Sequence, residues 1–331
     1  MILSAKQVHT LAYDALVLCG TSEVNANLVA NALLAAELAD QAGHGLRRLE
    51  SYCAQAQSGK VDGHAVPTLE KVASATLKVD AAHGFSYPAL DLVLQQLPQM
   101  ARQFGIAIAG VKRSHHCGVV GVEVEKYADM GLVALMFANS PAAIAPWGGS
   151  AGLFGTNPIA FAAPQKDAPP IVIDVSLSKV ARGKVIVAQQ KGEAIPEGWA
   201  LGPDGEKTTD PEVAMKGTMV PMGDAKGTAL ALMVELLAAS LNGADSASEL
   251  SSFVDTKGAS PKAGQTIIAI DPTKLGGELV LRYFSDLANK ITAQEGARVP
   301  GDRRHKMKQQ FLTDGISVDA DLVEQIKKIG R

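Results

Sequence analysis

The sequence contains few of the residues that mark several common classes of protein. Of its 331 residues only three are cysteines, Cys19, Cys53 and Cys117, too few and too scattered for a disulfide framework or a cysteine-rich zinc site. This scarcity fits a reducing cytoplasm, and we expect no metal centre. Aromatic residues make up only 5% of the chain. No basic segment is interleaved with them, so a surface that stacks nucleic-acid bases is not expected.

A strong net charge and long apolar runs are also missing. The formal net charge of -3 argues against nucleic acid or an anionic membrane as the main partner. Apolar stretches are strand-length or broken by charge, below the roughly 20 residues that a membrane-spanning helix needs. The first residues lack the pattern of a secretion signal. We therefore expect a cytoplasmic protein that binds neither nucleic acid nor a membrane.

The order of hydrophobic patterns predicts a mixed α/β fold. The chain begins with apolar positions at helical spacing, opened by a capping box of Ser4 and Gln7. From residue 75 onward strands alternate with helices, which favours a mixed or parallel sheet covered by helices. We predict a mixed α/β cofactor- and substrate-binding domain over residues 75–282 and a helical domain assembled from residues 1–74 and 283–331. The expected strands are 75–80, 106–111, 132–137, 159–163, 171–175 and 265–270.

The segment from Gly43 to Tyr52 is the first candidate site. Arg48 and Tyr52 lie four residues apart, on one face if a helix starts at Gly45, with His44 at its open end. A histidine exchanges protons near neutral pH, and an arginine clamps a carboxylate through two parallel hydrogen bonds. Together they indicate a site for a small organic acid. The alternative from spacing alone is a surface histidine beside two solvated arginines.

A second candidate is the adjacent pair His115 and His116. In an extended segment neighbouring side chains point to opposite sides, so a metal shared by both is not expected. One of them then faces the cleft. Cys117 follows, and because no base and orienting partner is identifiable for it, we interpret it as a small core thiol.

A third pattern concerns phosphate groups. The Gly-x-Gly-x-x-Gly turn of a Rossmann site is absent. Backbone amides at helix starts with a nearby lysine are what a pyrophosphate needs. Three loops have such groups: residues 174–179, Gly183 with Lys184, and residues 223–227, which include Lys226.

Several segments in order resemble the malate/L-lactate dehydrogenase family with its non-Rossmann NAD(P)-binding fold. They read SHHCGVVG, ANSPAAIAPWGG, LFGTNPIAFAAP, SKVARGK, IPEGWALGPDGEKTTDP, PMGDAKG and RVPGDRR. The resemblance implies that His44 is the proton donor, that Arg48 and Tyr52 bind the substrate, and that His116 is a second active-site histidine. The implied cofactor contacts are Ser140, Asp174, Ser176, Ser178, Lys184, Asp224, Lys226 and a late loop with Arg303 and Arg304.

Two departures from the family pattern bear on the substrate. Gly43 stands where the family usually has serine, and Cys117 stands in place of a phenylalanine. The first removes a hydroxyl donor and the second is expected to enlarge the pocket beside His116. Both favour a cyclic 2-imino acid, 1-pyrroline-2-carboxylate or 1-piperideine-2-carboxylate, reduced to L-proline or L-pipecolate. The alternatives are a 2-hydroxy acid dehydrogenase of the malate or lactate type and a catalytically silent cofactor-binding protein.

The same resemblance predicts the cofactor and the assembly. Arg303 and Arg304 suit the extra 2'-phosphate of NADPH, so NADPH is expected in preference to NADH. The family also implies a homodimer with the active site near the subunit contact.

Overall fold

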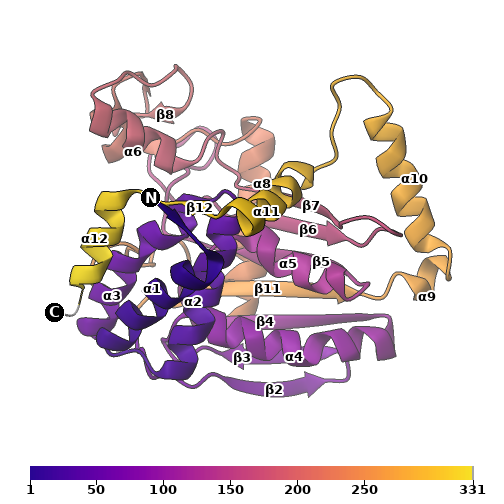
Figure 1. Ribbon diagram of the computed structural model, residues 1–331. Coiled ribbons are helices and arrows are strands. Elements are labelled where there is room, and N and C mark those ends of the chain that lie inside the picture. Colours follow the sequence, from indigo (N-terminus) through magenta and orange to yellow (C-terminus); the bar gives the residue numbers. More distant parts are fainter. Residues whose placement is uncertain (330–331) are drawn as a thin grey trace.

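A seven-stranded mixed sheet forms the centre of the computed structural model, which describes residues 1–329 (Figure 1). In spatial order the strands are β2 (Thr68–Ala73), β3 (Thr76–Asp80), β4 (Ile106–Ser114), β11 (Ala263–Ile270), β5 (Val133–Ala138), β6 (Ile159–Ala163) and β7 (Ile171–Val175). The expected mixed α/β fold is confirmed.

Four of these strands run in the same direction. β3 and β4 are parallel, β11 is antiparallel to both β4 and β5, and β6 is antiparallel to both β5 and β7. The carboxyl ends of β3, β4, β5 and β7 therefore lie along one edge of the sheet. Ligands of α/β proteins are usually held in the loops at such an edge. His116, Ser140 and Ser176 follow three of these strands.

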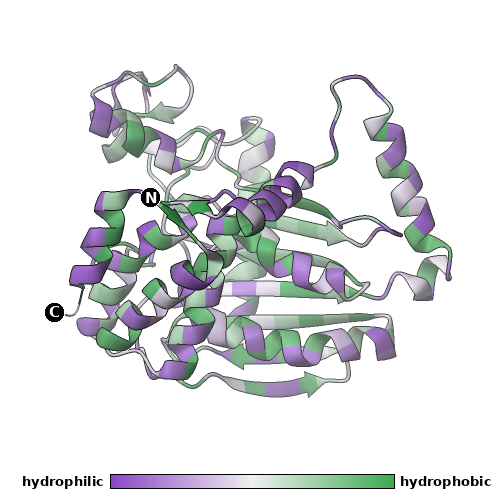
Figure 2. Ribbon diagram, in the orientation of Figure 1, coloured by the Kyte–Doolittle hydropathy of each residue, from purple (hydrophilic) through white to green (hydrophobic). Residues whose placement is uncertain are grey.

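Helices cover both faces of the sheet. α4 (Ser86–Phe104) and α5 (Val120–Asp129) pack on one face, and α8 (Ala225–Ala238) packs on the other (Figure 1). Val93, Leu97 and Val124 are fully buried between the first two helices and the sheet. Figure 2 shows the central strands as largely hydrophobic. Burial of this apolar surface contributes roughly 25 cal/mol per Å². It holds the sheet rigid, and so it also holds the loops at the carboxyl ends of the strands in place.

A helical layer at one end of the sheet has its own core. It comprises α1 (Ala5–Leu18), α2 (Glu23–Leu38), the 3-10 turns η1 (Ala42–His44) and η2 (Leu46–Arg48), α3 (Leu49–Gln57) and α12 (Ala320–Lys328). β1 (Ile2–Leu3) pairs with β12 (Ile316–Ser317), which ties the two ends of the chain together. Ser4 makes the expected capping box with Gln7. Val8, Leu33 and Leu49 are fully buried in this core.

The remaining elements lie outside these layers. A lobe above the sheet contains α6 (Arg182–Lys191), α7 (Pro211–Lys216) and the short strands β8 (Ala200–Leu201), β9 (Lys207–Thr208) and β10 (Thr218–Met219) (Figure 1). The turn η3 (Ser240–Asn242) follows α8. The last helices before α12 are α9 (Thr273–Gly276), α10 (Val280–Thr292) and α11 (Asp302–Asp314).

The predicted domain boundaries do not fit the packing at two places. β2 pairs with β3, so a boundary after residue 74 would divide a hairpin of the main sheet. α10 lies far from the N-terminal helices (Figure 1), and Ser285 on it bonds instead to Lys166 beyond β6. The division into two units remains a proposal, with residues 68–74 and 283–292 moved to the α/β unit.

The described part of the chain contains no helix of the length and apolarity needed to cross a membrane. The cytoplasmic location stays a prediction.

Candidate active site

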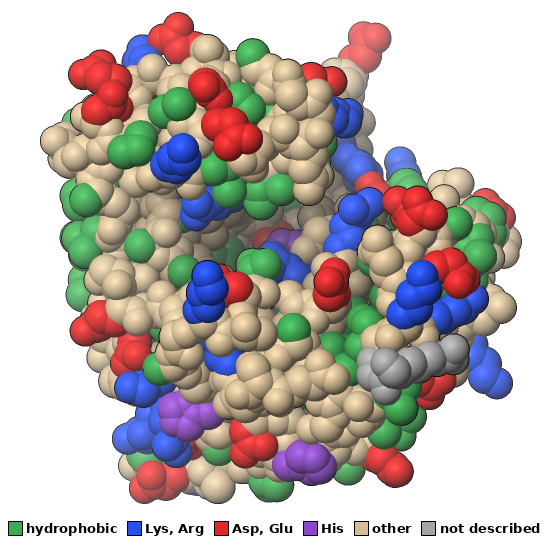
Figure 3. All heavy atoms as spheres, turned by 90° about the vertical axis from the view of Figure 1, so that its left-hand side faces the viewer, with side chains coloured by type: hydrophobic (Ala, Val, Ile, Leu, Met, Phe, Trp, Pro, Cys, Tyr) green, Lys and Arg blue, Asp and Glu red, His purple; other side chains and the backbone are tan. Residues whose placement is uncertain are grey.

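A deep hollow opens between the upper lobe and the N-terminal helices, with basic and histidine side chains at its floor (Figure 3). His44 is the last residue of η1, and His116 follows the end of β4. Their imidazole rings stack, with centroids 5.1 Å apart and planes 8° apart. Nδ1 of His44 lies 3.1 Å from Nε2 of His116. Two segments 72 residues apart thus build one histidine pair.

Arg48 lies beside this pair, where η2 passes into α3. Its Nε donates to the carbonyl oxygen of Gly43 at 3.0 Å. The two terminal amino groups of Arg48 make no hydrogen bond or ion pair with any residue from 1 to 329. They remain available to clamp a carboxylate in the bidentate manner.

Burial and Arg48 together keep the histidines uncharged. Desolvation by burial, then the charge of Arg48, lowers the pKa of His44 to about 4. The same two causes lower the pKa of His116 well below its usual value. Burial lowers the pKa of His115 to about 3. When no ligand is bound, all three imidazoles are therefore neutral at neutral pH. Each ring then has one nitrogen that donates a hydrogen bond and one that accepts.

His115 and His116 have different partners, as expected for neighbours. Nε2 of His115 lies 3.0 Å from Oε1 of Gln55, whereas His116 contacts His44 and Tyr52. Both rings contact Phe253, at centroid distances of 5.0 Å and 5.9 Å. Gln55 also donates to the carbonyl oxygen of Phe253 at 3.0 Å. The loop with Phe253 therefore forms one wall behind the histidines, a role with no signal in the local sequence.

Two expectations from the family pattern need correction. Tyr52 is fully buried, and its hydroxyl bonds to His116 Nδ1 at 2.5 Å and to Tyr87 Oη at 3.0 Å. It therefore contacts the second histidine from behind and is not placed to bind a substrate. Cys117 is 6% exposed within the main core, and burial raises the pKa of its thiol to about 12. It is a core thiol, and so little exposed area gives no structural support for an enlarged pocket.

The predicted cofactor contacts gather at the same edge of the sheet. Ser140 Oγ, after β5, accepts from the Thr156 amide at 3.1 Å. Ser176 and Ser178, after β7, bond to each other through their hydroxyls at 3.1 Å. Asp224 precedes α8 with a φ of 57°, an uncommon value for a residue with a side chain. Such strain is often found in ligand-binding loops.

The basic residues predicted to bind the cofactor have different surroundings in the structure. Lys226 is exposed at the start of α8 with no ion pair to the described residues. Lys184 instead covers the ring of Trp199 in the upper lobe, at 5.8 Å from its centroid. Arg303 and Arg304 were expected in a loop, but α11 already begins at Asp302, so both lie in its first turn. Arg303 forms an ion pair with Asp40.

Arg304 forms part of a compact cluster at the start of α5. Its Nη2 donates to Asp174 Oδ2 at 3.0 Å, and the same oxygen accepts from the Gly121 amide at 3.0 Å. Nη1 of Arg304 is buried without a partner among the described atoms. A Cβ at position 121 would collide with both side chains. A buried guanidinium nitrogen without a partner, next to the start of a helix, suits a phosphate or the amide oxygen of a nicotinamide cofactor.

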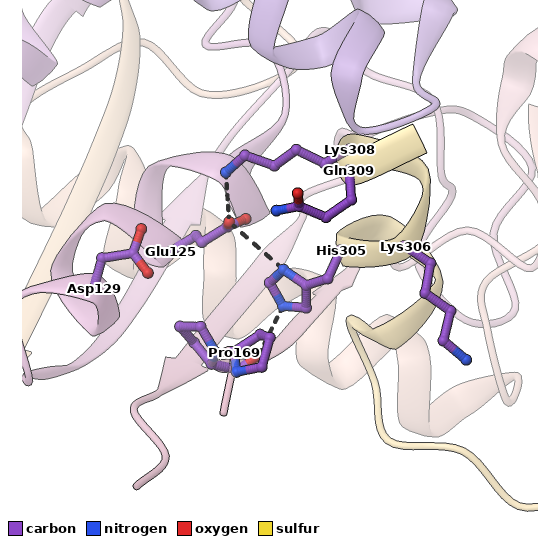
Figure 4. A pocket seen from close by; sticks show the side chains of 8 residues that line it. Glu125, Asp129, Pro169, His305, Lys306, Lys308 and Gln309 are labelled. Atoms are coloured by element: carbon purple, nitrogen blue, oxygen red, sulfur yellow. Dashed lines mark hydrogen bonds and ion pairs between the residues drawn. The ribbon is translucent and has the colours of Figure 1, made fainter. Parts of the chain in front are cut away.

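A second hollow, of about 520 Å³, lies between α5 and α11 (Figure 4). Lys308 Nζ lies 3.1 Å from Glu125 Oε1, and His305 Nε2 donates to the carbonyl oxygen of Pro170 at 2.9 Å. None of the predicted site residues lines it. It is separate from the histidine pair.

Comparison with known proteins agrees with this arrangement. A family model described as malate/L-lactate dehydrogenase matches residues 3–327. The chain belongs to the malate/L-lactate dehydrogenase family. It is therefore an oxidoreductase that uses a nicotinamide cofactor.

Named relatives of this family member fall into two chemical groups. The chain is 46% identical to the (2R)-3-sulfolactate dehydrogenase (NADP(+)) of Chromohalobacter salexigens, over 93% of this chain and 92% of that one. It is 37% identical to the Delta(1)-pyrroline-2-carboxylate reductase of Ancylobacter novellus, over 99% and 97%. Among solved structures, delta1-piperideine-2-carboxylate reductase from Pseudomonas syringae matches with a TM-score of 0.94 at 35% identity, covering 99% of both chains.

Proposed function

We propose that this chain transfers a hydride reversibly between NADP(H) and carbon 2 of a small 2-hydroxy or 2-oxo acid. The observation that carries this proposal is the free guanidinium of Arg48 beside the neutral pair of His44 and His116. The cofactor, when bound, supplies the hydride chemistry. Arg48 binds and orients the carboxylate. His44 gives a proton to the oxygen on carbon 2, or takes one from it in the oxidation.

The charge environment favours an oxygen substrate over an imine. Burial and Arg48 disfavour a positive charge on His44 and His116. The same environment disfavours a protonated imine at this place, whereas a carbonyl or hydroxyl is neutral. The relative at 46% identity is named for such a 2-hydroxy acid, so 3-sulfolactate and 3-sulfopyruvate are the first compounds to test.

A cyclic 2-imino acid, the substrate expected from the sequence, is the second candidate. Several relatives at 36–38% identity are named for pyrroline-2-carboxylate or piperideine-2-carboxylate reduction. Gly43 also supports it, because an imine does not present a carbonyl oxygen that needs a serine hydroxyl.

The test is a panel of substrates assayed with the purified protein. NADPH oxidation is followed with 3-sulfopyruvate, oxaloacetate, pyruvate, 1-pyrroline-2-carboxylate and 1-piperideine-2-carboxylate, and NADP+ reduction with (2R)-3-sulfolactate. We expect the highest kcat/KM for a 2-oxo acid, and Arg48→Ala should abolish it. Arg47→Ala, the exposed neighbour, is the matched control. A higher kcat/KM for a cyclic imine would establish the second candidate, and NADPH binding without any turnover would contradict both.

We also propose that NADPH is preferred to NADH. The support is the pair Arg303 and Arg304 in the first turn of α11, where guanidinium groups suit a 2'-phosphate. Arg303 has a side chain 69% exposed, so its ion pair with Asp40 is open to competition by a phosphate. The ratio of kcat/KM for NADPH and NADH should fall in Arg303→Ala. A wild-type preference for NADH would remove the argument.

We further propose that the chain forms the homodimer expected from the family. Two surfaces of the protein are apolar and exposed. The first runs from α9 into α10 and contains Leu275, Leu279, Tyr283 and Leu287. The second lies on α8 and contains Leu230, Leu232, Met233 and Leu236. Exposed apolar side chains grouped on a helix face are typical of a surface that a second subunit covers. The double variant Leu279→Lys with Leu287→Lys should shift the mass measured by light scattering to that of a monomer. Leu312→Lys, on α11, should not.

A further inference from the structure

Four side chains form a hydrogen-bonded row that leads from the cleft into the interior. Nδ1 of His44 lies 3.1 Å from Nε2 of His116, Nδ1 of His116 lies 2.5 Å from Tyr52 Oη, and Tyr52 Oη lies 3.0 Å from Tyr87 Oη. Tyr52 is 0% exposed and Tyr87 is 5% exposed. The row joins four parts of the chain: η1 with His44, the segment after β4 with His116, α3 with Tyr52 and the first turn of α4 with Tyr87.

The end of the row decides the direction of its hydrogen bonds. Tyr87 Oη has no other hydrogen-bond partner among residues 1–329. Its buried O–H is satisfied only by donating to Tyr52, since an unused buried donor is costly. Tyr52 then donates its own proton to Nδ1 of His116. That leaves the proton of neutral His116 on Nε2, where it is donated to Nδ1 of His44.

We infer that Tyr87, acting through Tyr52 and His116, is a positioning residue that fixes the tautomer of His44. Because Nδ1 of His44 accepts within the row, its proton is on Nε2, the nitrogen that has no partner among the described residues. This inference rests on the proposed function, in which that N–H is the group given to the substrate oxygen.

The surroundings of Tyr87 hold the row in place. The hydroxyl of the preceding residue, Ser86, donates to the carbonyl oxygen of His116 at 2.7 Å, so α4 fixes both the backbone and the ring of this histidine. Gly118, at a φ of 68°, passes so close that a Cβ there would lie 2.8 Å from Tyr87 Oη. The close approach of residue 118 thus confines the Tyr87 hydroxyl.

The row holds the histidine and does not supply its proton. If His44 drew a proton through the row, Tyr87 would be left as a buried tyrosinate. Burial raises the pKa of Tyr87 well above its usual value and that of Tyr52 to about 12, so this ionisation is strongly disfavoured. As Nε2 of His44 gives its proton to the alkoxide left by hydride addition, a proton from the solvent side of the cleft replaces it on Nε2, so His44 stays neutral and both tyrosines keep their protons.

The test is Tyr87→Phe, compared with Tyr127→Phe. Tyr127 is also buried, at 3% exposed, and its hydroxyl makes no hydrogen bond within the described chain. Removal of the Tyr87 hydroxyl should lower kcat roughly tenfold, the factor that corresponds to one ordinary hydrogen bond. KM for the acid and the Kd for NADPH should stay unchanged. Tyr127→Phe should leave all three values unchanged.

A second measurement separates this inference from the proposed function. In the wild-type protein, ¹⁵N NMR of the histidine side chains should show His44 protonated on Nε2, and Tyr87→Phe should give a mixture of tautomers. A proton on Nδ1 of His44, or an unchanged kcat and tautomer in Tyr87→Phe, would overturn the inference. If Tyr87→Phe does not fold, Tyr52→Phe breaks the row at its next link and is measured in the same way. Absence of turnover with every substrate would refute the proposed function alone, because the tautomer is still measured.

Discussion

Arg48 donates from Nε to the carbonyl oxygen of Gly43, and this 3.0 Å bond closes the chain around His44. The bond uses the inner nitrogen of the guanidinium, which leaves both terminal amino groups for an anion. One side chain thus fixes the turn that presents the proposed acid and also offers the carboxylate site. A lysine has a single nitrogen, so it cannot bond to this carbonyl oxygen and also present two parallel N–H donors to a carboxylate.

Replacement of Arg48 by lysine should therefore impair the enzyme although the charge is kept. We expect KM for the acid substrate to rise at least about tenfold, because two parallel hydrogen bonds are replaced by one flexible contact. Steady-state kinetics with the best substrate of the panel measures this. Arg47→Lys, at the exposed neighbouring position, should leave KM unchanged. A normal KM in Arg48→Lys would show that the guanidinium does not hold the carboxylate.

Glu37 holds the turn before Leu46, and its loss should lower the stability of the protein. Its Oε1 accepts from the Leu46 amide at 2.7 Å in a buried position. Glu37→Ala leaves that amide unsatisfied, at a cost of about 1–3 kcal/mol in the free energy of unfolding. Glu37→Gln keeps an acceptor and should lose much less. Denaturant unfolding of the two variants, with exposed Glu50→Ala as control, checks the order; equal losses in Gln and Ala would contradict it.

The fold could be predicted where the sequence pattern is local. The strands 159–163 and 171–175 and the capping box at Ser4 agree with the structure because apolar alternation and capping depend on neighbours in sequence. β2 was missed because its residues are mostly exposed and show no apolar alternation. α11 was missed for a similar reason: none of its residues is fully buried, and it is strongly hydrophilic (Figure 2).

The site residues, like the secondary structure, can be predicted only where the signal is local in the sequence. His44, Arg48 and His116 could be proposed from sequence because they lie in short segments that resemble a family pattern. Tyr87 and Phe253 have no such signal, since their role depends on contacts across 35 residues or more of sequence. Tyr52 was found but given the wrong partner, because spacing places it on the face of Arg48 without showing that its hydroxyl is buried against His116. Sequence suggests which side chains gather at the site, and the tertiary contacts determine which atom each group meets.

Asp174 and Arg304 should prove important for both cofactor binding and stability. Their side chains are 19% and 12% exposed, and Asp174 also accepts from the Gly121 amide. Asp174→Asn removes the charge that balances Arg304, so we expect a lower Tm and weaker binding of NADPH. Differential scanning fluorimetry and NADPH fluorescence titration measure the two effects. Glu197→Gln, which breaks an exposed ion pair with Lys207, is the control and should change neither.

Acid should destabilise the protein through its buried histidines, and His115 offers the cleanest test. Burial lowers the pKa of His115 to about 3 from the usual 6.5, so between these values the unfolded chain binds a proton that the folded chain does not. Stability therefore rises with pH across this window and is lost as the pH falls below about 6.5. Each such histidine contributes up to about 1.4 kcal/mol per pH unit.

His115→Gln removes one of these titrating groups, so the free energy of unfolding should depend less steeply on pH. The variant will be less stable at pH 8, because Gln55 loses its imidazole partner. The quantity to compare is the slope between about pH 5 and 6.5, above the range where carboxylates dominate. Urea unfolding at several pH values gives this slope for the wild type, for His115→Gln and for exposed His64→Gln. The slope of His64→Gln should match the wild type, and an unchanged slope in His115→Gln would show that His115 is not held neutral in the folded protein.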